Sequence, residues 1–181
     1  MQQSRGFTLL ELLVVLVLIG IGLTLAVLSV GSGGLNRQLE QEARRFISLT
    51  ELAGDEAIIQ GREFGIDFSN SGYRFLTLVD GHWIIYQEDK LYRQRTLPDS
   101  AFFKLFIDNL PFDLPEQFVE IKPVVKDEES PSQQHKPQLF ILSSGEHNTF
   151  ELQLHTPNEA HYQIDGDMMG SLSMAQLDSE Q

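Results

Sequence analysis

The chain has 181 residues, of which 13 are basic and 26 acidic, giving a formal net charge of −13. This length fits one globular domain with an appended segment, and so acidic a surface disfavours sequence-independent binding to nucleic acid. The sequence contains no cysteine, which excludes disulfide bonds, thiolate catalysis and cysteine-ligated metal sites.

The first predicted element is an apolar helix. The sequence from Leu12 to Val30 carries no charged residue. A helix of that length spans about 28 Å, close to the hydrocarbon thickness of a bilayer. Arg5 is the only charged residue before the apolar run, so the positive-inside rule leaves the N-terminus in the cytoplasm. We therefore expect one membrane-spanning helix with the rest of the chain outside the cytoplasm.

Glu11 interrupts this apolar stretch and divides the possible interpretations. A cleaved secretory signal has a shorter apolar core and ends in small residues, and Val30-Gly31-Ser32 matches that pattern poorly. A plain membrane anchor explains the length of the run. It does not explain an acid inside the helix, which costs about 2.5–3.5 kcal/mol at the bilayer centre and less near the headgroups.

Residues 6–11 read Gly-Phe-Thr-Leu-Leu-Glu; they follow a short polar leader that contains Arg5 and run into the apolar stretch. This arrangement resembles the type IV prepilin signature, in which the cleavage site, the acid and the apolar run must all agree. In that family, prepilin peptidase cuts after the glycine and methylates the new amino terminus. The resemblance implies a leader peptide over residues 1–6, cleavage between Gly6 and Phe7, and N-methylation of Phe7.

Glu11 would then be the fifth residue of the mature chain, within a transmembrane and filament-core helix over residues 7–30. The new amino terminus is a charge in an apolar bundle, and a buried charge is tolerated mainly when it is paired. The Glu11 carboxylate can pair with the amino terminus of a neighbouring subunit that is offset along the filament axis. We therefore expect Glu11 to set the axial register of the subunit during assembly.

Four small residues, Gly31-Ser32-Gly33-Gly34, follow the apolar run and predict a break or flexible hinge. A helix cap followed by a linker would have the same composition. Residues 35–60 predict a second, amphipathic helix that ends at Gly61 and packs one face on a sheet. The apolar stripe on that face consists of Leu35, Leu39, Ala43, Phe46, Leu49, Ala53 and Ala57.

Beyond Gly61 the apolar period changes to two, which predicts strands. The strongest pattern is a hairpin in which Asp80-Gly81, a pair typical of a type I′ turn, joins residues 73–79 to residues 82–87. Turns are also predicted at residues 143–146 and 165–167. The other predicted strands are residues 64–68, 91–95, 101–107, 118–122, 138–142, 149–155 and 161–165.

The polar, proline-punctuated residues 126–137 predict a mobile surface loop, and residues 174–181 predict a loose C-terminal tail. Together the elements predict an α+β architecture in which residues 35–173 form the globular domain. In it, the outer half of a long N-terminal helix packs on antiparallel β-sheet. This is also the pilin-like fold that the N-terminal resemblance implies.

The sequence offers little support for an enzyme or a metal site. The five histidines lack the spacing of zinc motifs. Asp165 and Asp167 could ligate calcium, but a dedicated loop has more oxygen ligands, so a turn is favoured. Trp83 and Tyr86 fit either a core or a protein interface. No phosphate-binding loop or nucleophile–base pair is found, so we expect a structural protein without a cofactor.

Residues 42–68, residues 137–157 and the closing stretch YQIDGDMMGSLS are similar to the minor pseudopilin H family of type II secretion. This resemblance implies a structural subunit in the tip complex of a short periplasmic filament, the pseudopilus, that drives export of folded proteins across the outer membrane. In that family, the extreme tip subunit typically lacks the acid that matches Glu11. The resemblance therefore implies a position beneath the tip.

The resemblance also implies partners and a location. The partners are the major pseudopilin G, the minor pseudopilins I, J and K, prepilin peptidase and the inner-membrane assembly platform. The location is the inner membrane, with a single span, a cytoplasmic N-terminus and a periplasmic C-terminal domain, and then the assembled periplasmic pseudopilus.

Two alternatives remain open from the sequence. One is a minor pilin of a type IV pilus or DNA-uptake filament, although the net charge of −13 argues against contact with DNA. The other is a membrane-anchored periplasmic binding domain without a role in a filament.

Overall fold

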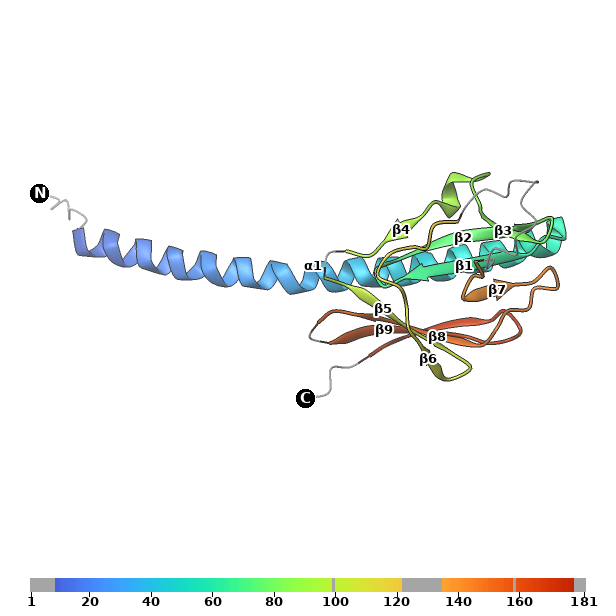
Figure 1. Ribbon diagram of the computed structural model, residues 1–181. Coiled ribbons are helices and arrows are strands. Elements are labelled where there is room, and N and C mark those ends of the chain that lie inside the picture. Colours follow the sequence, from blue (N-terminus) through green and yellow to red (C-terminus); the bar gives the residue numbers. More distant parts are fainter. Residues whose placement is uncertain (1–8, 99, 122–134, 158, 178–181) are drawn as a thin grey trace, which may run out of the picture. The chain divides into compact units, whose positions relative to one another are not determined.

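The computed structural model describes residues 9–98, 100–121, 135–157 and 159–177, with the backbone alone described for residues 21–33 and residue 160. In this part of the chain it contains one long helix, one short 3-10 helix and ten strands (Figure 1). The chain divides into two compact units, residues 1–37 and residues 38–181, and the long helix runs through both.

The long helix, α1 (Leu9–Gln60), is a single helix of 52 residues. It continues through residues 31–34, so the predicted break between two helices is wrong. Glycine costs about 1 kcal/mol relative to alanine in a helix, but it keeps the backbone N–H and C=O that the helical hydrogen bonds require. No proline occurs before Pro98 to remove such a donor. The helix ends before Gly61, whose φ of 62° confirms the predicted terminator.

The part of α1 in the second unit buries the predicted apolar stripe from Leu39 to Ala57, whereas Leu35 is half-exposed and lies in the first unit. Phe46 is 1% exposed and Leu49 is 7% exposed, while Leu39 and the three alanines of the stripe are fully buried. The opposite face carries exposed charges, including Arg44, which forms an ion pair with Glu40 four residues before it at 2.9 Å. The amphipathic pattern therefore predicted correctly which face of the helix packs on the sheets.

The first sheet is antiparallel and has the order β3-β2-β1-β7, with β4 also paired to β2. The predicted hairpin is confirmed, because β2 and β3 are joined by Asp80 and Gly81 with φ angles of 50° and 78°, as a type I′ turn requires. The strands of this sheet are β1 (Phe64–Ser69), β2 (Gly72–Val79), β3 (His82–Ile85), β4 (Arg95–Thr96) and β7 (Leu139–Ile141).

The second sheet is also antiparallel and has the order β10-β9-β8-β5-β6. Two of its strands, β6 and β10, were not predicted. Residues 174–176 belong to β10, so the loose tail predicted from residue 174 is wrong there. The strands of this sheet are β5 (Phe102–Ile107), β6 (Leu110–Phe112), β8 (Phe150–His155), β9 (Ala160–Gly166) and β10 (Leu172–Gln176).

Three local predictions also differ from the structure. Of the strand predicted over residues 91–95, only Arg95 lies in a strand, at the start of β4. The 3-10 helix Lys90–Tyr92 occupies its beginning, and the Asp89 carboxylate caps that helix by accepting a hydrogen bond from the backbone N–H of Leu91 at 2.8 Å. Residues 118–121 form no strand. The predicted turn at residues 165–167 lies about two residues later, since β9 continues to Gly166.

Residues 126–134 of the predicted loop lie outside the described residues; residues 135–137 have no regular secondary structure, and Pro137 is buried.

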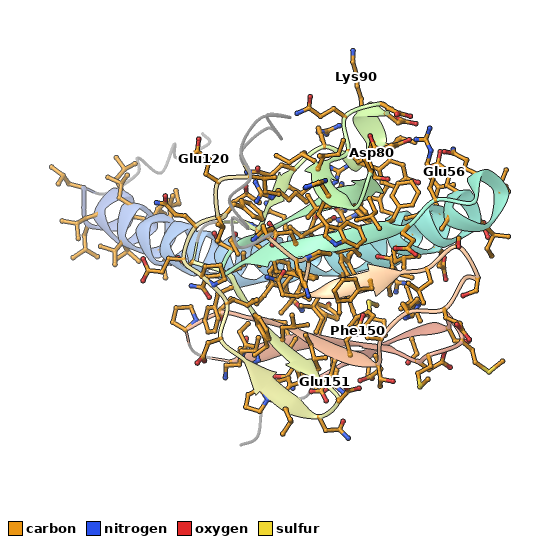
Figure 2. All side chains as sticks on the ribbon, turned by 45° about the vertical axis from the view of Figure 1, so that its right-hand side comes forward. Glu56, Asp80, Lys90, Glu120, Phe150 and Glu151 are labelled. Atoms are coloured by element: carbon orange, nitrogen blue, oxygen red, sulfur yellow. The ribbon has the colours of Figure 1, made fainter. Side chains whose placement is uncertain are left out.

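Aromatic side chains join α1 to both sheets in the second unit. The ring of Phe46 on α1 lies 5.2 Å from that of Tyr73 and 5.8 Å from that of Phe68, both in the first sheet. It also lies 6.4 Å from the ring of Phe150 in the second sheet. Figure 2 labels Phe150 among the side chains of the domain. Phe103 of the second sheet contacts Phe68 directly, at 5.7 Å. One continuous core therefore connects α1 with both sheets, as expected for an α+β domain.

Candidate functional site

The predicted assembly site lies at the N-terminus of the chain. Gly6 and Phe7 lie outside the described residues. Glu11 lies in the first turn of the described α1, and its side chain is exposed. A carboxylate near a helix N-terminus interacts favourably with the helix dipole. The position of Glu11 is therefore favourable for the helix. The residues around Glu11 are apolar.

The beginning of α1 has an apolar surface on every side. The large apolar side chains between Leu9 and Ile19 are each 41–83% exposed in the described structure. Because successive residues are about 100° apart around a helix, these side chains cover its whole circumference. A helix with such a surface is expected to be covered by other helices or by lipid. Among the residues that the structure describes, no helix is long and apolar enough for a membrane span.

A buried acid, Glu42, connects α1 with the first sheet. It is 8% exposed, and its Oε1 accepts a hydrogen bond from the Tyr73 hydroxyl at 2.8 Å, while its Oε2 accepts one from Arg45. Burial and the neighbouring Glu42 carboxylate raise the pKa of Tyr73 well above its ordinary value. Both Glu42 oxygens and the Tyr73 hydroxyl have partners within the protein, so this cluster stabilises the domain.

A second buried acid, Asp67, fastens two loops to the first sheet. Its carboxylate forms an ion pair with Arg74 at 2.7 Å and lies 2.8 Å from Nε2 of His135. Arg74 also donates to the backbone carbonyl of Val119 at 2.6 Å and lies over the ring of Phe118. These contacts explain why residues 118–121 are ordered without being a strand. These contacts were not predicted, because the periodicity of a sequence does not show which charged residues pair in the folded protein.

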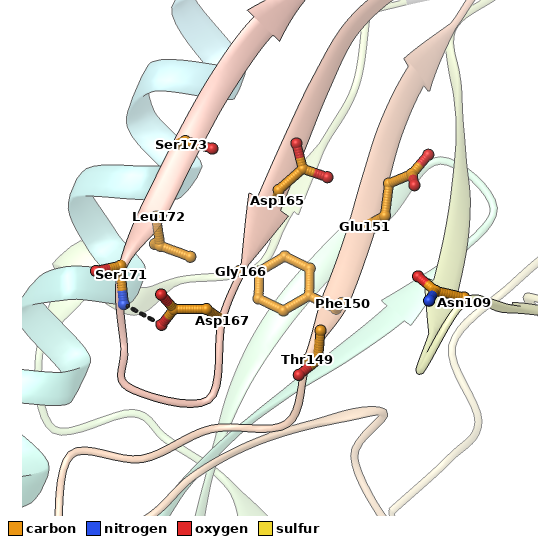
Figure 3. Close-up of a pocket in the computed structure, with 10 residues that line it drawn as sticks. All are labelled: Asn109, Thr149, Phe150, Glu151, Asp165, Gly166, Asp167, Ser171, Leu172 and Ser173. Carbon is orange, nitrogen blue, oxygen red and sulfur yellow. Dashed lines mark hydrogen bonds between the residues drawn. The ribbon is translucent and has the colours of Figure 1, made fainter.

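An open hollow of about 380 Å³ lies at one end of the second sheet (Figure 3). Three carboxylates line it, and each already has a partner. Glu151 accepts a hydrogen bond from Gln153, Asp165 accepts hydrogen bonds from Gln163, and Asp167 accepts them from the backbone of its own turn. In the described part of the chain, no three acidic or histidine side chains are placed to hold a metal ion. Asp165 and Asp167 therefore serve as hydrogen-bond acceptors, Asp165 within the sheet and Asp167 within the turn.

The described histidines serve separate local contacts. The ring of His155 stacks on Phe102 at 5.4 Å, and burial, with Lys104 nearby, lowers its pKa. His161 lies 3.0 Å from the Thr156 hydroxyl.

The two aromatic residues of the hairpin differ in environment. Tyr86 is 4% exposed and packs on Phe64 in the core. Trp83 is half-buried and contacts Phe140 at 5.7 Å between ring centroids. The core interpretation therefore holds for Tyr86, whereas Trp83 packs on the surface of the first sheet.

Comparison with known proteins identifies the family. A family model described as the prokaryotic N-terminal methylation motif matches residues 1–27. A second model, described as type II transport protein GspH, matches residues 42–170, which is more than half of the chain. The chain belongs to the GspH family.

Relatives within the GspH family extend over most of the chain. Type II secretion system protein H of Pseudomonas aeruginosa is 35% identical over 156 residues, covering 85% of this chain and 84% of that protein. The protein of the same name from Aeromonas hydrophila is 29% identical over 184 residues, covering 99% of this chain and 97% of that protein. The resemblance to the minor pseudopilin H family is therefore confirmed.

Solved structures support the fold of this GspH-family chain. The crystal structure of the minor pseudopilin EpsH from the type II secretion system of Vibrio cholerae superposes with a TM-score of 0.61 and 25% identity. The match covers 80% of this chain and 99% of that chain. The α+β pilin-like fold is confirmed, and a minor pseudopilin of type II secretion is favoured over a minor pilin of a type IV pilus.

Proposed function

We propose that this GspH-family chain is a structural, non-enzymatic subunit of the type II secretion pseudopilus that helps form the tip complex through which folded proteins are exported. The observation that carries the proposal is the GspH match over residues 42–170 behind a methylation motif over residues 1–27. The exposed apolar start of α1 supports it, because such a surface requires lipid or neighbouring helices.

The proposal includes the maturation of the N-terminus. Prepilin peptidase removes residues 1–6, cutting between Gly6 and Phe7, and Phe7 becomes N-methylated. Residues 7–30 then hold the subunit in the inner membrane, with the leader on the cytoplasmic side and the globular domain in the periplasm. The methylation motif supports this order of events.

Glu11 favours transfer of the subunit from the lipid bilayer into a filament. A carboxylate in a bilayer helix is costly, and pairing with the amino terminus of an adjacent subunit offsets that cost. Its presence places this subunit beneath the tip in the proposal, with the major pseudopilin G and the minor pseudopilins I, J and K as neighbours. The assembly platform of the inner membrane would build the filament from these subunits.

A complementation experiment tests the proposed function. Cells that lack this gene but keep the other secretion genes should regain export of their secreted proteins when they produce the wild-type chain. The Glu11→Ala variant should be cleaved normally but restore export poorly, because the amino terminus of its neighbour loses its partner. Glu51→Ala is the matched control, since Glu51 is an exposed acid farther along α1.

Failure of the wild-type chain to restore export would overturn the proposed function. Full export by the Glu11→Ala variant would instead remove the pairing role of Glu11 and leave the function standing.

A further inference from the structure

Exposed apolar side chains gather at the end of the second unit where α1 terminates. They come from three segments: the last turn of α1, the loop after β7, and the turn between β9 and β10, which lie together at the right-hand end of Figure 1. We define the distal patch as Ile58, Ile59, Leu142, Met168 and Met169, which are 55%, 82%, 36%, 66% and 88% exposed. Large apolar residues on surface turns are unusual, and when they cluster they mark interaction surfaces.

Two glycines bring the three segments into direct contact. A side chain at Gly145 would approach Cδ1 of Ile58 to 2.9 Å, and one at Gly170 would approach the Gly145 carbonyl oxygen to 2.9 Å. Both glycines have a φ of 87°, which other residues rarely adopt. The end of α1 therefore lies on the first turn, and the first turn lies against the second. The three segments that carry the distal patch therefore lie side by side.

The turn that carries the two methionines is held in place by Asp167. One oxygen of its carboxylate accepts hydrogen bonds from the backbone N–H groups of Met169 at 2.8 Å and Ser171 at 3.0 Å (Figure 3 shows the second). The backbone N–H of Gly170 also donates to the Asp167 carbonyl at 3.2 Å. A preformed turn loses little conformational entropy on binding, so the exposed methionines are well prepared for a protein contact.

The border of the distal patch is acidic. Asp55 lies three and four residues before Ile58 and Ile59 on α1, and is therefore beside them on the helix surface. Glu146 and Asp167 are exposed in the two turns. Arg62 lies near the end of the helix, but its charge is balanced by an ion pair with Glu88 at 3.0 Å.

The acidic border of the distal patch determines which charge a partner surface must carry. A second copy of the chain would bring another acidic border and a formal charge of −13 to the contact, and like charges across an interface are unfavourable. Lysine or arginine around an apolar contact would be attracted instead.

We propose that the distal patch docks the head of a neighbouring, non-identical filament subunit whose contact surface is apolar and bordered by lysine or arginine. The proposal rests on the proposed function, which places the chain among other pseudopilins. Ile59 and Met169 are its central contacts, because they are the most exposed members of the patch. The acidic border orients the partner and excludes a second copy.

Photo-crosslinking in cells tests this surface with the full chain. A benzophenone amino acid replaces Met168 in cells that contain the complete secretion apparatus, and the product is identified by mass spectrometry. We expect one product with another filament subunit, crosslinked close to lysine or arginine residues. The same probe at Val119, which is 48% exposed in the segment that contacts Arg74, is the matched control and should not give that product.

Substitutions then test the chemistry of the contact, with the probe kept at position 168. Ile59→Asp and Met169→Asp should each lower the yield about tenfold, as loss of a central contact does. The double variant Asp55→Lys with Glu146→Lys should also lower it. Val119→Asp should leave it unchanged.

Three outcomes would overturn the proposal: a product between two copies of this chain, a yield that rises on charge reversal, or no product in cells that export normally. The last result would leave the proposed function intact, whereas loss of export with the wild-type chain would overturn both.

Discussion

At the scale of single residues, two buried acids connect different elements of this domain. Glu42 links α1 to Tyr73 of the first sheet, and Asp67 links Arg74 and His135. Buried carboxylates are tolerated when their oxygens are paired, and removing one partner leaves the others unsatisfied. These two clusters should therefore be more sensitive to substitution than the many acids on the surface.

Replacing Glu42 tests this directly. Glu42→Ala leaves the buried Tyr73 hydroxyl without its acceptor and should lower the free energy of unfolding by about 1–3 kcal/mol. Glu40→Ala is the control, because the Glu40–Arg44 pair is exposed and its loss should cost less than about 0.5 kcal/mol. Urea unfolding followed by circular dichroism measures both. Equal effects would show that burial of Glu42 does not matter.

Alkaline pH provides a second test. The folded protein raises the pKa of Tyr73, mainly through burial and then through Glu42. Above a pH of about 10, tyrosine in the unfolded chain loses its proton while folded Tyr73 keeps it, so the folded state binds more protons and stability falls as pH rises. Urea unfolding across this range should show a smaller fall for Tyr73→Phe than for the wild type. An identical fall would contradict the assigned cause.

At the scale of elements, α1 combines two environments in one continuous helix. Its beginning exposes apolar side chains on every side, whereas its last part buries a single stripe against two sheets. Gly34, at the end of the small-residue stretch 31–34, is exposed and has no side chain that could pack. A helix that is neither packed nor rich in good helix formers is expected to open more readily than its neighbours.

Hydrogen exchange tests this local weakness. Backbone amides at residues 31–34 should exchange faster than those between Leu39 and Ala57, which are covered by the sheets. Gly34→Ala should slow exchange around it about fivefold, since alanine favours the helix by about 1 kcal/mol and a side chain at Gly34 meets no other atom within 4 Å. Equal exchange along the whole of α1 would argue against a flexible hinge.

At the scale of the whole molecule, the second unit has a complete core. Rings from α1 and from both sheets meet around Phe46, and the described sheets are antiparallel throughout. The unit should therefore fold without the apolar beginning of α1. The division into two units also explains how one chain can have an apolar N-terminus and a strongly acidic head, because the acidic residues lie almost entirely beyond residue 34.

Expression of residues 35–181 tests this independence. We expect a soluble protein that unfolds in one cooperative transition in urea, unaffected by reducing agents because the sequence has no cysteine. This head should not restore export in cells that lack the gene, since it has no filament-core helix. A head without a cooperative transition would contradict the independence of the second unit.

The sequence predicted the elements that carry strong periodicity. The stripe on α1 and the Asp80-Gly81 hairpin were correct because helical spacing and type I′ turn chemistry are local signals. β6 and β10 were missed because they are short or weakly alternating strands at sheet edges, where pairing decides the structure. The helix break at residues 31–34 was predicted wrongly. The glycine-rich composition there favours a break, whereas the helical sequences on both sides favour one continuous helix.

For the candidate site, the motif from Gly6 to Glu11 was readable because the proposed cleavage, methylation and assembly would act on neighbouring residues. The distal patch was not readable, because its members are far apart in the sequence and only the two glycine contacts bring them together. The same holds for the Glu42–Tyr73 and Asp67–His135 contacts, which depend on the tertiary fold.

Identifying the mature N-terminus is the most direct test of the proposed function, because recognition, cleavage and methylation must all occur at one place. Mass spectrometry of the chain isolated from membranes of cells with active prepilin peptidase should find a protein that begins with N-methylated Phe7. A chain that still begins with Met1 in those cells, or one cut within residues 31–34, would contradict it.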